Sequence, residues 1–292
     1  MKQTFYSILS LVLLAGCSSE MPEQNSLQGE TVPLVISSIR IDSDVSTRTS
    51  DIPLEEGTLG IFRTGGSSYT PAAYRYAGSG GNWTSVSPLT LGPDEAFVCA
   101  WLPYDYFSPS TTDDLSRCPM SAQIYSHEGD LAFLPTTGGL DRQHPQLNVR
   151  LTHAYGLLSF TLHRDVTYKG EGKVTGITLK NGGIVRTAMM DIRDGSFSNR
   201  DIVTSLALDT SVTVTNDKAP TIKILVPPQT FADTELELEV DGKTLKGTFS
   251  ASSIGELKSG GARTFNVTLR RNLELSVSIL SPDGSAGGEI IW

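Results

Sequence analysis

Short apolar runs separated by turn residues constrain the fold of this chain more than any other feature of its sequence. From residue 32 onward, runs rich in β-branched and aromatic residues recur, and Gly, Asn, Asp, Ser and Pro lie between them. Examples are VPLVISSIRI (32–41), TLGIFR (58–63), AFVCAWLPY (96–104), GLLSFTLHR (156–164), TIKILVPPQ (221–229) and RTFNVTL (263–269). The sequence has no helical stripe longer than two turns. We therefore predict an all-β fold made of β-sandwiches.

Two of these runs show the alternation of a strand that has one face in a core. In ELELEV (235–240), apolar residues alternate with glutamate, so one face is apolar and the other is charged. A second strand near the C-terminus places four apolar residues on one face, namely Leu273, Leu275, Val277 and Ile279. The pair Asp241-Gly242 follows the first strand and predicts a hairpin turn.

A polar, proline-bearing stretch, LDRQHPQLN (140–148), interrupts the strand pattern near the middle of the chain. We place a domain boundary there. The sequence then predicts one sandwich domain over 32–147 and a second over 148–292. At 31.4 kDa the chain is long enough for two modest domains.

The N-terminal residues indicate export. An apolar run from Phe5 to Gly16 is shorter than the roughly 20 residues that cross a bilayer, but it fits a secretory signal. The run ends in Leu-Ala-Gly-Cys, which looks like the lipobox of a bacterial lipoprotein, where Cys17 would be acylated, for example by palmitate. The alternative is an ordinary signal peptide whose cysteine is lost on cleavage. We expect a signal peptide over 1–16 and a lipidated, flexible tether over 17–31.

Charge argues against two classes of partner. The chain has 32 acidic and 23 basic residues, a net charge of −9, and its sequence contains no long basic patch. We therefore expect neither nucleic acid nor an anionic membrane face as a partner.

Two cysteines remain besides Cys17. Export would permit a disulfide between Cys99 and Cys118, the only pair available. The alternative is two unpaired thiols, because Cys99 lies in an apolar run where a small buried side chain fits well. Neither cysteine has the spacing of a metal site.

The sequence lacks the local signatures of common enzymes. It contains no H-E-x-x-H, no G-x-S-x-G and no G-x-x-x-x-G-K-[ST] motif, and its four histidines lack metal-ligand spacing. The exposed aromatic residues Tyr104, Tyr106 and Phe107 could stack on a sugar, although such a cluster more often packs one end of a sandwich. We expect no enzymatic activity, no catalytic residues, no metal and no cofactor.

The order and spacing of several short motifs resemble the fimbrillin, or type V pilin, family of Gram-negative bacteria. The matching points are the lipobox at Cys17, STRT (46–49), LGIF (59–62), YRYAGSGGNWTS (74–85), AFVCAWLPY (96–104), LTHAYGLLSFTL (151–162), ILVPPQTF (224–231) and GGEIIW (287–292). Each motif is short, but together they span nearly the whole chain.

The resemblance implies two tandem transthyretin-like β-sandwiches in a structural subunit of an adhesive surface fimbria. It implies export as an outer-membrane lipoprotein precursor and cleavage by an arginine-specific surface protease in an early loop. Here the cut would fall between Arg48 and Thr49, because the nearest competitor, Arg40, lies inside the predicted strand 32–41. The cut would remove the tether and that first strand.

The resemblance further implies that a strand of another fimbrial subunit fills the vacated groove. An unpaired edge exposes N–H and C=O groups that template strand addition, and a head-to-tail contact of this kind yields a fibre. The removable strand carries Leu34, Val35, Ile36, Ile39 and Ile41. The donor would lie within 273–292, with candidate residues Leu273, Leu275, Val277, Ile279, Ile290, Ile291 and Trp292.

Several alternatives stay open at this point. The sequence does not separate stalk, tip, accessory and anchor positions, and it does not identify a host or bacterial surface ligand. A different class of function is a surface glycan-binding lipoprotein that does not polymerise. Such a protein would carry a platform of exposed aromatic side chains on one face.

Overall fold

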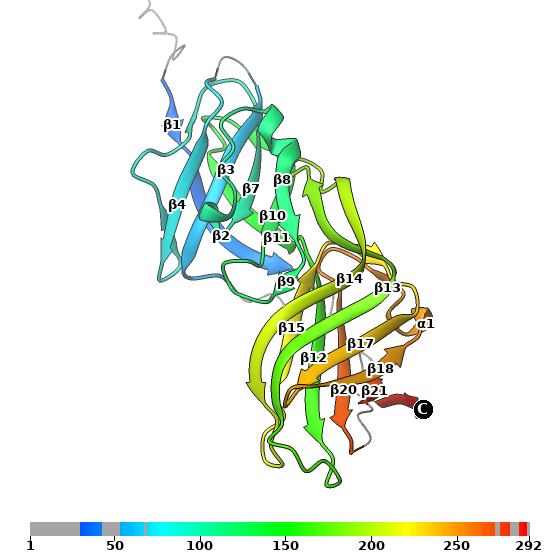
Figure 1. The fold of residues 1–292 in the computed structure, drawn as a ribbon. Coiled ribbons are helices and arrows are strands. Elements are labelled where there is room, and N and C mark those ends of the chain that lie inside the picture. The colour runs from blue at the N-terminus through cyan, green and yellow to red at the C-terminus, as the bar shows by residue number, and fades with distance from the viewer. Residues whose placement is uncertain (1–29, 43–52, 67–68, 272–274, 281–285, 291–292) are drawn as a thin grey trace, which may run out of the picture. The chain divides into compact units, whose positions relative to one another are not determined.

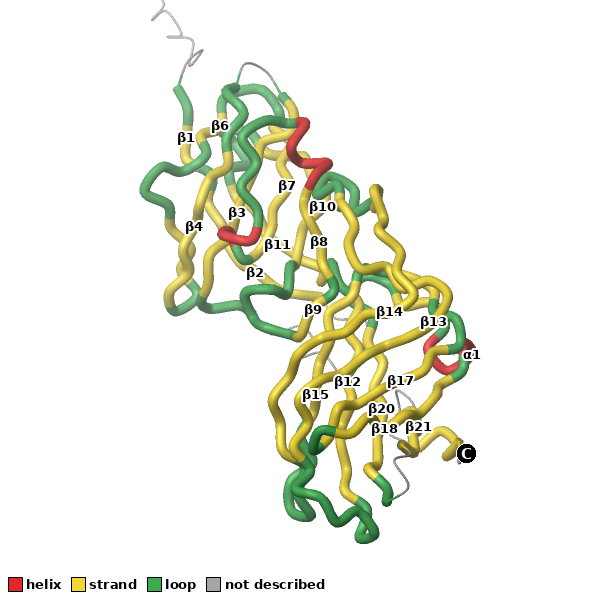
Figure 2. Tube along the Cα trace, in the orientation of Figure 1, coloured by secondary structure: helices red, strands yellow, loops and turns green. Residues whose placement is uncertain are grey.

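The computed structural model describes residues 30–42, 53–66, 69–271, 275–280 and 286–290, and they form an almost purely β structure (Figures 1 and 2). The all-β prediction is confirmed. The helical segments in the described part of the chain are two 3₁₀ turns, Tyr104–Tyr106 and Asp113–Arg117, and α1 (Ala251–Ile254). No helix within these residues has the length and apolar character needed to cross a membrane.

The strands of the first half close into a barrel. Its order is β10-β11-β2-β5-β4-β3-β7. The strands are β2 (Val35–Asp42), β3 (Gly57–Gly65), β4 (Ala73–Ser79), β5 (Asn82–Thr84), β7 (Ala96–Leu102), β10 (Ala132–Leu140) and β11 (Gln146–His153). A separate two-stranded sheet joins β1 (Val32–Pro33) to β6 (Thr90–Leu91). Strand alternation is the same in a barrel and in a sandwich, so the sequence could not predict the closure.

Two further sheets, formed mostly by strands of the second half of the chain, enclose one core. One sheet has the order β22-β21-β20-β12-β15-β9, and the other has the order β14-β13-β17-β18 with β8 paired to β13. Their strands are β8 (Cys118–Ser121), β9 (Gln123–Ile124), β12 (Gly156–Arg164), β13 (Lys173–Met190), β14 (Phe197–Thr213), β15 (Thr221–Val226), β17 (Thr234–Val240), β18 (Lys243–Phe249), β20 (Ala262–Leu269), β21 (Leu275–Leu280) and β22 (Ala286–Ile290). Two further short strands, β16 (Gln229–Thr230) and β19 (Glu256–Leu257), pair with each other.

Aromatic rings occupy the space between these two sheets. The ring of Phe265 lies 5.0 Å from that of Phe160 and 5.1 Å from that of Phe249. These residues come from β20, β12 and β18, so both sheets contribute to the same core. The second half is therefore a two-sheet sandwich.

The alternating strand at 235–240 behaves as its pattern predicts. Leu236, Leu238 and Val240 are fully buried in β17, while Glu239 on the other face is exposed. The Asp241-Gly242 pair takes positive φ angles of 51° and 72° and connects β17 to β18. Positive φ at both positions is the geometry of a tight hairpin turn, which confirms the predicted hairpin.

Two details bear on the predicted division at 147/148. That point falls inside β11, which pairs with β10 and β2 of the barrel as far as His153. In addition, β8 and β9 precede β10 in the chain but pair with β13 and β15 of the later sheets. The division into two transthyretin-like domains stays a prediction.

Candidate functional site

β2 closes the barrel between two very different neighbours. On one side it runs parallel to β11 and pairs with it over Gln146–Thr152. On the other side it meets β5 through one residue pair, Ile36 with Trp83, and Arg40 forms an isolated bridge with Pro53. In Figure 1, β2 is the blue strand that crosses the barrel. One continuous ladder thus holds this strand, and its opposite edge makes short contacts.

Apolar side chains anchor the predicted first strand, residues 32–41, in the barrel core. Leu34, Ile36 and Ile39 are 3%, 6% and 1% exposed. Fully burying such a side chain contributes about 1.5–3 kcal/mol. The burial of apolar side chains therefore stabilises the predicted strand substantially in the barrel.

The strand does not direct all five predicted residues inward. Val35 is 47% exposed and faces away from the core, so its side chain does not contribute to the packing of the strand in the barrel. Ile41 is partly buried and packs against the core. The ladder with β11 shifts between Ile36 and Ser38, so Ser37 is an extra residue. This bulge explains why the buried positions change from 34 and 36 to 39.

The first strand packs beside residues of β11 that sequence reasoning did not single out. In the ladder, Leu147 lies opposite Ile36, Val149 opposite Ile39 and Leu151 opposite Ile41. The three β11 residues are 6%, 1% and 0% exposed. The alternating run QLNVRL at 146–151 is the signal that could have identified them.

Tyr76 on β4 fixes the start of the first strand. Its hydroxyl donates to the Leu34 carbonyl at 3.5 Å and accepts from the Leu89 amide at 3.1 Å. The Leu34 amide donates to the Leu89 carbonyl at 2.7 Å. Burial raises the pKa of Tyr76 to about 12, so the hydroxyl keeps its proton and can donate.

The predicted processing and lipidation residues lie outside the described residues. Cys17, Arg48 and Thr49 are among them. The structure does describe the residues that lie before and after this segment. β2 ends at Asp42, and Pro53 and Leu54 return beside it, with the Leu54 amide donating to the Ile39 carbonyl at 2.9 Å. Arg40 lies within β2, as predicted, with backbone partners on both sides.

The candidate donor residues divide into two strands of the chain's own sheet. Leu275, Val277 and Ile279 belong to β21, which lies between β20 and β22. Ile290 belongs to β22, which forms the end of the sheet and, among the described strands, pairs only with β21. Leu273, Ile291 and Trp292 lie outside the described residues.

The two cysteines are free and buried in the structure, so the possible disulfide is not formed there. Cys99 and Cys118 belong to one hydrophobic cluster with Trp101, Met120 and Met190. Burial raises the pKa of each thiol to about 12. Their place in an apolar cluster corresponds to the alternative of two small hydrophobic residues.

The aromatic residues considered for sugar stacking pack inward instead. The ring of Tyr104 stacks on Trp101 at 6.2 Å, and Phe107 meets the same indole edge-on at 5.7 Å. The Tyr106 hydroxyl bonds that of Tyr155 at 2.5 Å and donates to the Pro119 carbonyl at 2.9 Å. These residues belong to, or pack against, one hydrophobic cluster and do not form an open platform.

The described residues contain no group of three or more His, Cys, Asp and Glu side chains that could hold a metal ion. The histidines make local contacts. His153 Nδ1 lies 3.1 Å from Asp130 Oδ2, and His163 Nε2 lies 3.2 Å from Asn266 Oδ1. The feature that the geometry does define is the first strand, which lies in the barrel and is held by packing and backbone hydrogen bonds.

Solved structures with the same fold come from Bacteroides. A proposed cell adhesion protein of Bacteroides ovatus is 15% identical with a TM-score of 0.63, covering 90% of this chain and 98% of its own. A proposed cell adhesion protein of Bacteroides uniformis is 14% identical with a TM-score of 0.60, covering 85% and 97%. A proposed polysaccharide-binding protein of Bacteroides thetaiotaomicron is 12% identical with a TM-score of 0.51, covering 88% and 98%. At these identities the likeness shows the fold alone.

A search of curated protein sequences gave no match. A family profile described as fimbrillin-like matches residues 47–280, which is most of the chain. The family is one of fimbrial structural proteins and not of enzymes, in agreement with the prediction from sequence. The chain belongs to the fimbrillin-like family.

Proposed function

We propose that this protein is a structural subunit of an adhesive surface fimbria and that it assembles by exchange of its first strand. Its family and the cell adhesion proteins among its structural neighbours support a place at the cell surface beside other fimbrial subunits. The precursor is an outer-membrane lipoprotein acylated at Cys17. An arginine-specific surface protease cuts it between Arg48 and Thr49.

The observation that carries the proposal is the position of β2. It is an early strand that completes the barrel, and the chain that joins it to β3 contains Arg48. A cut at Arg48 therefore turns an integral strand into a separate peptide that only packing and backbone hydrogen bonds retain. Its departure would expose the edge of β11 over Gln146–Thr152 and the apolar seat beneath it.

The cut does not by itself empty the groove. Leu34, Ile36 and Ile39 together contribute roughly 5–9 kcal/mol of burial, at about 1.5–3 kcal/mol each. The severed strand therefore stays in place until an incoming strand replaces the same contacts. Cleavage makes exchange possible, and a donor of matching apolar pattern drives it. The intact first strand keeps precursors apart before processing.

Within this chain, β22 is better suited than β21 to become a donor. Within the part of the chain that the structure describes, β22 pairs only with β21, so releasing it breaks one ladder, whereas releasing β21 breaks the ladders with β20 and β22. We therefore place the donor at residues 286–292, which carry Ile290, Ile291 and Trp292. A chain that keeps β22 in its own sheet would accept a strand without giving one, as a tip subunit does.

The test is N-terminal sequencing and intact mass of protein recovered from the cell surface, with unboiled and boiled denaturing gels. We expect a start at Thr49 and an SDS-resistant ladder that collapses on boiling. Arg48→Ala should leave the acylated N-terminus at Cys17 and abolish the ladder. Arg40→Ala, a matched change within β2, should leave both unchanged.

Two results would overturn the proposal, and a third would exclude only the donor that it names. Arg48→Ala protein that still starts at Thr49 and forms ladders as the wild type does would exclude cleavage at this arginine as the trigger. Wild-type protein that stays monomeric with acylated Cys17 would exclude strand exchange and leave a retained anchor or a glycan-binding lipoprotein. A deletion of residues 286–292 that still forms full ladders would exclude β22 as the donor.

A further inference from the structure

The first strand pairs with β11 through an interrupted ladder. Ile36 lies opposite Leu147 and Ser38 lies opposite Asn148, so Ser37 is inserted between two consecutive positions of the ladder. A bulge of this kind leaves the extra residue outside the ladder and disrupts the hydrogen bonding beside it, and it is rare between parallel strands. The strand therefore pairs with β11 less well than an unbroken strand would.

The wall that β11 presents to the core is regular, in contrast to the strand that covers it. Its buried residues recur at every second position: Leu147, Val149 and Leu151. The first strand meets them with Ile36, Ile39 and Ile41, where the first spacing is three residues and the second is two. Because side chains alternate along a strand, a strand with an apolar residue at every second position would match this wall without a bulge.

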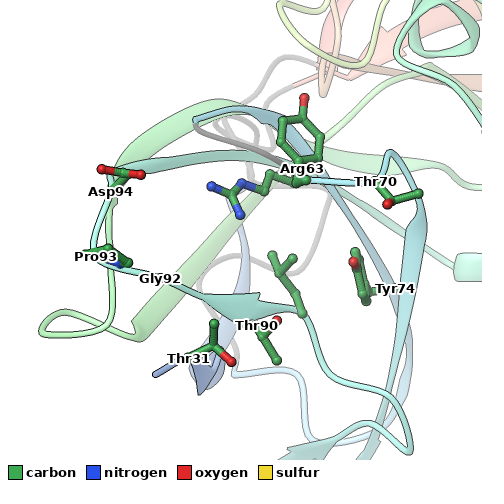
Figure 3. Close-up of a pocket in the computed structure, with 10 residues that line it drawn as sticks. Thr31, Arg63, Thr70, Tyr74, Thr90, Gly92, Pro93 and Asp94 are labelled. Carbon is green, nitrogen blue, oxygen red and sulfur yellow. The ribbon is translucent and has the colours of Figure 1, made fainter. Parts of the chain in front are cut away.

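The part of the groove that selects an incoming strand begins at Leu34. The residues before it form the two-residue strand β1, and a cavity of about 400 Å³ lies beside them (Figure 3). Figure 3 shows Thr31 and Thr90 on one side of this cavity, so the start of the strand borders open space. Leu34 is 3% exposed, and its amide donates to the Leu89 carbonyl at 2.7 Å. Any residue except proline can supply that amide.

On the basis of the strand exchange proposed for this protein, we propose that the vacated groove takes a strand of a different subunit with four apolar residues at strictly alternate positions. These side chains take the sites of Leu34, Ile36, Ile39 and Ile41. The incoming strand makes the same apolar contacts and also continues the ladder that the bulge at Ser37 interrupts. The bulge thus makes the chain's own first strand a weaker occupant, which gives the exchange its direction.

A second copy of this chain does not readily supply such a strand. Of the large apolar residues in the segment 286–292, only Ile290 and Trp292 would share a face of an extended strand. The run from Leu273 to Ile279 has the required alternation, but its described part belongs to β21, which lies between β20 and β22. The occupant is therefore a strand of another fimbrial subunit, and the donor of this chain enters a different groove.

The first test is a competition between peptides for the cut chain. The precursor is cleaved with an arginine-specific protease, and N-terminal sequencing confirms a start at Thr49. It is then incubated with an equimolar excess of two peptides, VPLVISSIRID (32–42) and the same peptide without Ser37. Native mass spectrometry measures the ratio in which they are bound. The matched control is the 32–42 peptide with Ser37→Ala, which keeps the extra residue, and a peptide of residues 286–292 represents a second copy.

We expect the peptide without Ser37 to occupy the cut chain about threefold to tenfold more than the 32–42 peptide, because one additional net hydrogen bond corresponds to this factor. The Ser37→Ala peptide should be bound as well as the 32–42 peptide, and the 286–292 peptide should not compete. Equal occupancy by the first two peptides, the same preference with Ser37→Ala, or effective competition by 286–292 would each overturn the proposal. If no peptide enters the cut chain, strand exchange itself fails, and this proposal fails with it.

Deletion of Ser37 from the uncleaved chain tests the bulge without processing. We expect the deletion to raise the midpoint of urea unfolding and to slow ladder formation at the cell surface. Ser37→Ala should leave both near the wild type, because Ser37 is exposed and the residue count is unchanged. A lower midpoint would show that barrel closure needs the bulge and would overturn the proposal. The unfolding measurement needs neither cleavage nor exchange, so it separates a failure of this proposal from a failure of the proposed function.

Discussion

Ile36 on β2 lies opposite Trp83 on β5, and both side chains are almost fully buried, at 6% and 7% exposure. This pair is where the first strand meets β5 and the barrel closes. On its other side, Ile36 lies opposite Leu147 of β11. A single residue thus lies between both neighbours of the strand that we propose is exchanged.

The anchoring role of the first strand can be measured by truncating one buried residue and one exposed residue within it. Ile39 is 1% exposed, so Ile39→Ala should lower the free energy of unfolding by about 2–5 kcal/mol. Val35 is 47% exposed, so Val35→Ala should change it by about 0.5 kcal/mol or less. Urea unfolding of the uncleaved chain measures both. Equal effects of the two substitutions would contradict the burial that supports strand exchange.

A glycine on β4 makes room for the indole that faces Ile36. Gly78 lies opposite Trp83, and a Cβ at Gly78 would come within 2.7 Å of the indole ring. Gly78→Ala must therefore displace Trp83 and disturb the packing of β2. We expect the free energy of unfolding to fall by about 1–3 kcal/mol. Gly92→Ala is the matched control, because a Cβ there meets nothing within 4 Å. Chemical unfolding together with tryptophan fluorescence would detect the displacement.

If Gly78→Ala is as stable as Gly92→Ala and leaves the fluorescence unchanged, the indole does not occupy this position. The comparison is informative because both changes add the same methyl group and reduce the backbone entropy of the unfolded chain similarly. Only the contact with Trp83 differs between them.

Particular residues show what sequence reasoning could and could not reach. Alternation predicts correctly that Leu236, Leu238 and Val240 are buried, because the period of a strand is local. The neighbours that β2 packs beside were not predicted. β2 pairs in parallel with β11, more than a hundred residues away, and such long-range pairing leaves no local signal. The exposure of Val35 depends on a bulge at Ser37, which an apolar run such as LVISSI does not reveal.

The same limit applies to segments that join distant sheets. β8 and β9 pair with β13 and β15, although a division at a polar stretch assigns them to the first half. Tyr76 also escaped notice, because its bond to the Leu34 carbonyl depends on how β4 packs beneath the first strand. Motif order, by contrast, was sufficient to indicate the family.

The cysteines allow a direct chemical test. Both thiols are buried and have a pKa raised to about 12, so they are protonated and shielded near pH 8. We expect native protein to react with iodoacetamide slowly at Cys99 and Cys118, and unfolded protein to react at both without any reductant. Peptide mapping by mass spectrometry distinguishes these two from Cys17. A requirement for reductant in the unfolded chain would instead establish a disulfide.

Two lysines, Lys180 on β13 and Lys246 on β18, flank Glu237 on β17 and make stability depend on pH. Lys180 Nζ lies 2.6 Å from Glu237 Oε2, and Lys246 Nζ lies 2.7 Å from Oε1. Hydrogen bonds from Lys180 and then Lys246 lower the pKa of Glu237 from 4.5 to about 2. Because the folded state holds the carboxylate at a lower pKa than the unfolded state, this stabilisation is complete above pH 4.5. It is lost as the pH falls towards 2.

Glu237→Gln should therefore lower the free energy of unfolding at pH 7 by about 1 kcal/mol or less, because both lysines are partly exposed to solvent. The difference in unfolding free energy between the variant and the wild type should become smaller as the pH falls from 4.5 towards 2. Urea unfolding across this range measures it, and Glu239→Gln, an exposed position on the same face, is the control. If the difference in unfolding free energy between Glu237→Gln and the wild type stays constant with pH, the lysines do not stabilise the charged carboxylate over the protonated one.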